Sequence, residues 1–202
     1  QVSHIFYAVL CSNPHLFFAI DWLLAQTPTR FYLLGSDDTF SCTLSTIVKE
    51  KLNHQDGLIV GEACIPLAEI DFHTIIQDIQ NCQPDVVFST LTGASNLVFY
   101  RQYQETGITA DDIPILSVNV SELELQQLPE KAIGHFASSS YFQTIDTPEN
   151  HSFVQAFQQR YGSDRVINEA ISTAYTQLYL WKQTVSIAKS TQTEAVRDAA
   201  IG

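Results

Sequence analysis

Residues 86–96 combine a buried-strand pattern with a small, polar, glycine-containing turn that leads into a helix. The turn offers hydroxyls, an amide and backbone N–H groups at a helix start, from Thr92, Gly93, Ser95 and Asn96. None of these groups is a strong nucleophile or base without a partner. The stretch therefore predicts a place that binds a neutral or anionic small molecule and does not react with it.

The remaining reactive side chains form no pattern typical of an active site. Glu122 and Glu124 could pair for acid–base chemistry, but no nucleophile accompanies them. The histidines show no HxxxH or HExxH spacing, and the cysteines match no zinc pattern and no CxxC motif. For the cysteines we favour buried thiols over two disulfides; they are Cys11, Cys42, Cys64 and Cys82. We therefore expect a chain that is not an enzyme and that holds no metal and no cofactor.

The charge balance excludes two classes of partner. The chain has 22 acidic and 10 basic residues and a net charge of −12. Nucleic acids and anionic membrane surfaces both require clustered Lys and Arg, so we expect neither as a partner. There is no run of ~18 apolar residues, so we expect no membrane insertion. The sequence shows no signal peptide and does not begin with Met, which predicts a mature protein or part of a longer chain.

The polar turn needs a scaffold, and the apolar pattern predicts an α/β one. Strand-like runs occur at 5–9, 31–34, 58–67, 86–91, 113–118 and 135–142. Helical patterns separate them at 13–24, 42–54, 71–79, 97–107 and, briefly, after 122. This alternation predicts a mostly parallel sheet with right-handed crossovers. Polar turns should then gather at one sheet edge, the usual ligand crevice of such folds; they are 35–38, 92–96, 119–122 and 143–147.

The pattern changes after Pro148. Amphipathic helices are predicted at 153–161, 171–185 and 193–200 with no strand between them. We interpret the aromatic side chains of 171–181 as core residues because their spacing is helical. These helices need a surface to pack on, which indicates more chain in the native protein.

Several stretches carry a family resemblance. They are FYLLGSD (31–37), STLTGASN (89–96), YFQTIDTP (141–148), and AY (174–175) followed by YLWKQ (179–183). In these stretches the chain is similar to the urea and short-chain-amide receptors, a branch of the type I periplasmic binding proteins. The resemblance implies a three-layer, mostly parallel sheet in an incomplete two-lobed fold. Residues 1–148 would be the second lobe, with the ligand crevice at the strand ends, and 149–202 a helical part of the first lobe.

The same resemblance implies a set of ligand-binding residues: Tyr7, Asp38, Phe40, Thr92, Gly93, Asn119 and Ser121. Asp38 stands where the amide receptors usually have a Tyr, so a ring that covers the ligand has become a carboxylate. Asp38 could accept hydrogen bonds from amide or urea N–H groups or balance a cationic ligand. A solvated loop acid or helix cap is the alternative interpretation. Phe40 could still supply an aromatic wall.

The resemblance implies a solute-binding domain of an ABC uptake system. Its ligand would be small and polar: urea, a short amide or an amino-acid-like molecule. An ABC permease or a fused signalling domain would be its partner, and its location periplasmic or extracytoplasmic, with a cytoplasmic one left open. The alternative hypothesis is a ligand-sensing or dimerisation module of a signalling or regulatory protein, which could form a homodimer.

Overall fold

The computed structural model describes residues 13–26, 30–128 and 133–201. The chain divides into two compact units. The sheet unit comprises the described residues up to Ser140, and the helical unit comprises those from Tyr141 onward. The predicted strand 5–9, which includes Tyr7, lies outside the described residues.

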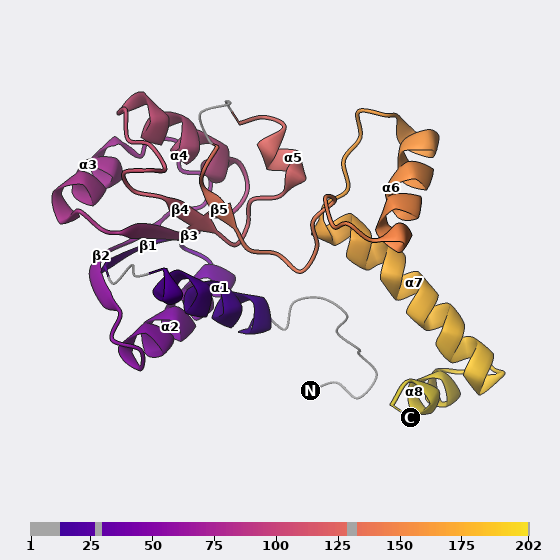
Figure 1. Ribbon diagram of the computed structural model, residues 1–202. Helices are drawn as coiled ribbons and strands as arrows, with labels where there is room; N and C mark the ends of the chain where they lie inside the picture. Colours follow the sequence, from indigo (N-terminus) through magenta and orange to yellow (C-terminus); the bar gives the residue numbers. More distant parts are fainter. Residues whose placement is uncertain (1–12, 27–29, 129–132, 202) are drawn as a thin grey trace. The chain divides into compact units, whose positions relative to one another are not determined.

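The sheet unit contains a five-stranded parallel sheet with the strand order β2-β1-β3-β4-β5. Its strands are β1 (Arg30–Ser36), β2 (Leu58–Ile65), β3 (Val86–Thr90), β4 (Ile115–Ser117) and β5 (Phe136–Ala137). Its helices are α1 (Asn13–Ala25), α2 (Thr39–Asn53), α3 (His73–Cys82), α4 (Ala94–Glu105) and the short α5 (Glu122–Leu125). Figure 1 shows α1 and α2 on one face of the sheet and α3 and α4 on the other. The predicted three-layer α/β fold is thereby confirmed.

Alternation along the strands divides the core between these two faces. Phe31 and Leu33 of β1 pack into the cluster under α1 and α2, and Tyr32 and Leu34 pack into the cluster under α3 and α4. A strand that is covered on both faces reads as a continuous apolar run, which explains why β1 was evident in the sequence. Each of these side chains is almost fully buried, and such burial stabilises the fold by about 1.5–3 kcal/mol per residue.

The fifth strand is much shorter than predicted. The pattern indicated a strand over 135–142, but β5 consists of Phe136 and Ala137 alone, paired with Leu116 and Ser117 of β4. The three-residue β4 leaves little edge for pairing. One further bond, from Ser138 N to Ser117 O at 2.9 Å, ends the ladder. The prediction failed because strand length here depends on the neighbouring strand and not on local hydrophobicity.

The helical unit contains α6 (Pro148–Tyr161), α7 (Glu169–Ala188) and α8 (Thr193–Ile201). Thr147 caps α6 by accepting a hydrogen bond from Asn150 N, and Pro148 occupies the first helical position. Phe153 and Tyr175 stack with ring centroids 4.3 Å apart. The prediction that the aromatics of 171–181 are core residues is not met, since α7 contains no buried residue and Trp181 is 56% exposed. The described residues of this unit include no strand on which α7 could pack.

Candidate ligand-binding edge of the sheet

The order of strands reverses between β1 and β3, and this topological switch point is where open α/β sheets bind ligands. At the carboxyl ends of these two strands, Ser36 and Thr92 are hydrogen bonded. Ser36 Oγ accepts from Thr92 N at 3.1 Å and lies 3.3 Å from Thr92 Oγ1. Ser36 is buried and Thr92 is half-buried. The pair therefore joins the ends of β1 and β3, and Thr92 remains partly accessible to solvent.

The carbonyl oxygen of Thr90 connects the turns after three strands. It accepts hydrogen bonds from Ser41 Oγ at 2.8 Å and from Asn119 Nδ2 at 3.2 Å. Ser41 Oγ also lies 3.0 Å from Asp38 Oδ2, and Ser41 N donates to Asp38 Oδ1 at 2.8 Å. A hydroxyl has one proton, so Ser41 cannot donate fully to the carbonyl and to the carboxylate at the same time. Asp38 thus caps α2 and keeps acceptor capacity for a further donor.

The amino terminus of α4 is open. Gly93 is its N-cap, with φ 62° and ψ −143°, and no side chain caps the first turn. Apart from its chain neighbours, a Cβ at Gly93 would meet no atom of the described residues within 4 Å, so there is room beside this residue for a ligand atom. Uncapped N–H groups and the positive end of the helix dipole favour a carbonyl or carboxylate oxygen. The positive φ explains the glycine at this position.

Asn96 lies behind this helix end and is 1% exposed. Its Nδ2 donates to Leu91 O at 2.8 Å and to Asn119 O at 3.4 Å. Its Oδ1 has no hydrogen-bond partner within the described residues and is shielded from solvent. A buried acceptor without a partner lowers the stability of the fold. The Oδ1 atom of Asn96 therefore adds a polar group behind the edge but no hydrogen bond.

The structure brings four of the predicted binding residues to this edge: Asp38, Thr92, Gly93 and Asn119. Ser121 instead caps α5, in a reciprocal arrangement with the side chain of Glu124. Phe40 is half-buried and packs against the cluster under α1 and α2. Tyr7 lies outside the described residues. The predicted turn 143–147 belongs to the helical unit.

Ser36, Ser41 and Thr90 hold the edge together. The sequence places Ser36 in the polar turn 35–38 and does not single out Ser41 or Thr90. The apolar strand 31–34 leads directly into Gly35 and Ser36, so a slightly longer strand would have placed Ser36 at its end. The contacts of Ser41 and Thr90 join residues 49 positions apart. No local pattern contains such a contact.

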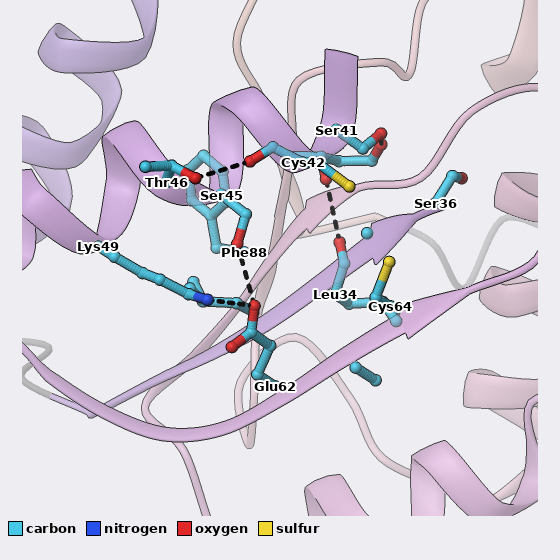
Figure 2. Close-up of a pocket in the computed structure, with 14 residues that line it drawn as sticks. Leu34, Ser36, Ser41, Cys42, Ser45, Thr46, Lys49, Glu62, Cys64 and Phe88 are labelled. Carbon is cyan, nitrogen blue, oxygen red and sulfur yellow. Dashed lines mark hydrogen bonds and ion pairs between the residues drawn. The ribbon is translucent and has the colours of Figure 1, made fainter. Parts of the chain in front are cut away.

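A cavity of about 240 Å³ lies between α2 and the strands β1 and β2 (Figure 2). It shares Ser36, Ser41 and Thr90 with the edge and also contains the ion pair of Lys49 Nζ with Glu62 Oε1, at 2.5 Å. Cys42 and Cys64 line it as well, and both are exposed, contrary to the expectation of buried thiols. Desolvation, together with the nearby Cys42, raises the pKa of the Cys64 thiol.

The architecture is that of the solute-binding proteins of ABC transporters. The chain superposes on such a protein from R. palustris, solved in complex with benzoate, with a TM-score of 0.86 and 15% identity. The superposition covers 98% of this chain and 54% of that one. At this identity the likeness shows the fold alone.

The chain belongs to the periplasmic binding protein domain family, which it matches over residues 1–202. It is 28% identical over 127 residues to the Leu/Ile/Val-binding protein homolog 6 of Brucella melitensis biotype 1, covering 61% of this chain and 33% of that protein. It is 37% identical over 65 residues to the limonene hydroxylase of Geobacillus stearothermophilus, covering 32% of this chain and 12% of that protein. The chain therefore spans about half the length of the similar solved structure and a third or less of these relatives.

These comparisons define the class of the chain and leave its ligand open. The family and the structural neighbours are binding proteins, which confirms the expectation of a chain that is not an enzyme. The match to the limonene hydroxylase covers 12% of that protein, so its name describes a chain that is mostly outside the matched segment. None of the helices in 13–26, 30–128 and 133–201 combines the length and hydropathy needed to cross a bilayer.

Proposed function

We propose that this chain is part of a solute-binding protein that presents a small polar ligand to the permease of an ABC uptake system, outside the cytoplasm. The Ser36–Thr92 contact at the switch point, beside the uncapped start of α4, is the observation that carries the proposal. This edge offers N–H donors from α4 and a carboxylate acceptor from Asp38. A ligand that has both an acceptor oxygen and an N–H or ammonium group fits such an edge.

Urea, short amides and amino acids all meet this requirement. The named ligands of similar proteins, benzoate and the branched-chain amino acids, share a carboxylate that an open helix amino terminus favours. The carboxylate of Asp38 adds a preference for a donor group, which an amide, urea or an α-amino group supplies and benzoate lacks. The proposed ligand class is therefore an amide, urea or an amino-acid-like molecule.

We infer that residues 1–148 belong to one lobe and 149–202 to the helical part of the other. The exposed apolar face of α7 supports this inference, because Leu178, Tyr179 and Trp181 are each at least half exposed. Ligand binding between two lobes would favour a closed conformation over an open one, which is the hinge-type shift such proteins use. Closure would be the signal that the permease reads.

Calorimetric titration of the protein in its full-length form tests the proposal, with urea, acetamide, leucine and benzoate as ligands. Asp38→Asn keeps a side chain that caps helices equally well but removes the charge. A charged hydrogen bond contributes about 1.5–3 kcal/mol, so we expect Asp38→Asn to weaken ligands with N–H or ammonium groups by about 10–100-fold. Thr43→Val is the matched control, since Thr43 is exposed on α2 and its hydroxyl donates to Thr39 O.

A sensing or dimerisation module is the alternative, favoured by the exposed apolar face of α7. It would be fused to a signalling domain or would form a homodimer. Absence of binding heat for all ligands at millimolar concentration, together with a dimer in sedimentation, would support this alternative. Ligand binding that Asp38→Asn and Thr43→Val affect equally would refute the proposed site but not the function.

A further inference from the structure

A second cluster of chemically active side chains lies next to the ligand-binding edge. The carboxylate of Asp37 and the thiols of Cys42 and Cys64 each offer one ligand atom, and the three atoms lie within 4.8 Å of one another. All three residues are exposed, so an ion has access to them from solvent. In Figure 2 the sulfur of Cys42, on α2, and the sulfur of Cys64, on β2, point toward one another.

Backbone hydrogen bonds fix the positions from which the three side chains extend. The carboxyl ends of β1 and β2 are paired in parallel. Asp37 N donates to Ile65 O at 2.6 Å, directly after Cys64, and Cys42 N donates to Asp38 O at 3.0 Å in the first turn of α2. The three side chains thus extend from a turn, a helix and a strand whose backbones are hydrogen bonded to one another. Little ordering would be needed for these side chains to close on an ion.

We propose that Asp37, Cys42 and Cys64 bind a zinc ion, with a water molecule in the fourth position. Zinc prefers tetrahedral sites built from thiolate, imidazole and carboxylate groups, and three protein ligands leave one position open. Magnesium and calcium prefer oxygen ligands only, so two thiolates exclude them. Binding breaks the two S–H bonds, forms two zinc–sulfur bonds and releases both protons to solvent, with no change in oxidation state.

The carboxylate is the feature that favours an ion over a disulfide. A disulfide between Cys42 and Cys64 would use two of the three clustered groups and would leave Asp37 beside a neutral bond. A divalent cation uses all three, and the site then has a net charge of −1. The ion would also fix the turn between β1 and α2, which follows Ser36 and carries Asp38, both residues of the ligand-binding edge.

Zinc titration of the reduced protein, followed by calorimetry and by metal analysis after dialysis, tests the proposal. We expect one zinc ion per chain, lost in Cys42→Ser and in Cys64→Ser. Loss of a residue that only orients a metal ligand already costs about 10–100-fold in metal affinity. Asp37→Asn removes the charge of a direct ligand, so we expect it to weaken zinc binding at least ~10-fold. Cys82→Ser is the matched control, because Cys82 also lies near a carboxylate, with Sγ 3.9 Å from Asp78 Oδ1, but outside the cluster.

Two measurements on the unmodified chain make the result independent of how the variants fold. Cobalt binding should produce a thiolate-to-cobalt charge-transfer absorption, and zinc should protect Cys42 and Cys64, but not Cys82, from alkylation read by mass spectrometry. A zinc affinity in the Cys42→Ser and Cys64→Ser variants equal to that of the wild type, or absence of zinc binding to the wild type at micromolar concentration, would overturn the proposal. So would a Cys42–Cys64 disulfide that persists in the isolated protein. These measurements do not involve urea or amino-acid binding. A negative result for zinc therefore leaves the proposed function untouched.

Discussion

Protonation of His135 is expected to destabilise the sheet unit in mild acid. His135 is half-buried between β4 and α4, and its ring centroid lies 5.5 Å from that of Tyr100 and 6.1 Å from that of Tyr103. Its Nδ1 accepts a hydrogen bond from Ile115 N at 3.1 Å, which requires an unprotonated Nδ1. Burial lowers the pKa of His135 from 6.5 to about 4. Burial also raises the pKa values of both tyrosines, so neither becomes charged in this range.

The direction of the effect follows from which state binds the proton first. Below pH 6.5 the unfolded chain protonates this histidine, whereas the folded chain does so only near pH 4. The free energy of unfolding therefore falls as the pH drops through this window and is fully retained above it. A pKa difference of this size corresponds to at most about 3.4 kcal/mol. Because the ring is partly exposed to solvent, we expect a loss of about 2 kcal/mol.

Urea denaturation at a series of pH values between 7 and 4 measures this loss. Carboxyl groups also titrate in this range, so the comparison is between the wild type and His135→Asn, whose side-chain oxygen can accept the bond from Ile115 N. The pH dependence of the variant should be shallower by about 2 kcal/mol. His73→Gln is the control, because His73 is exposed and paired with Asp71. A His135 ring that titrates near pH 6.5 by NMR, or parallel pH profiles for wild type and His135→Asn, would refute the reasoning.

Three further substitutions test what stabilises each unit. Gly61→Ala should destabilise the sheet unit by about 1–3 kcal/mol in urea denaturation, because the new Cβ would lie 2.5 Å from Cδ2 of the buried Tyr32, and an unchanged midpoint would contradict this. Asn150→Ala should lower the stability of the helical unit by about 2–3 kcal/mol, read by helical circular dichroism. Asn150 Nδ2 donates to Gln143 O and Ile145 O at 2.9 and 2.8 Å, and Oδ1 accepts from Tyr141 OH at 2.7 Å. Tyr141→Phe removes one of these three bonds and should cost about 1 kcal/mol; an equal loss in both variants would contradict the account.

The parts of the fold that depend on local pattern could be predicted from the sequence. The apolar run 31–34 identified β1 because the strand is covered on both faces. The spacing of Leu44, Val48 and Leu52 identified α2, although its start at Thr39 was placed three residues too late. That start depends on Asp38, for which the sequence leaves a ligand group and a helix cap as alternatives, and in the structure its side chain caps α2.

The parts that depend on contacts between distant segments could not be predicted. The cysteine spacing indicated no metal site, yet the fold brings Asp37, Cys42 and Cys64 together from a turn, a helix and a strand. The sequence predicts that the polar turns lie at one edge of the sheet. It does not predict which turns are neighbours, because the hydrogen bonds that join Ser36 to Thr92 and Thr90 to Asn119 depend on the strand order. Strand order is a tertiary property, and several orders fit one alternating sequence.

The two helices that begin at the switch point differ in how their amino termini are satisfied, and in the proposed function this difference would orient the ligand. The start of α2, after β1, is occupied by the carboxylate of Asp38, which offsets the positive end of that helix dipole. The start of α4, after β3, has no side-chain cap. An acceptor oxygen of a ligand therefore has its favourable position on the β3 side, at Gly93. A donor group has its favourable position on the β1 side, at Asp38. We infer that an amide or amino acid would lie across the switch point with its oxygen toward α4 and its nitrogen toward α2.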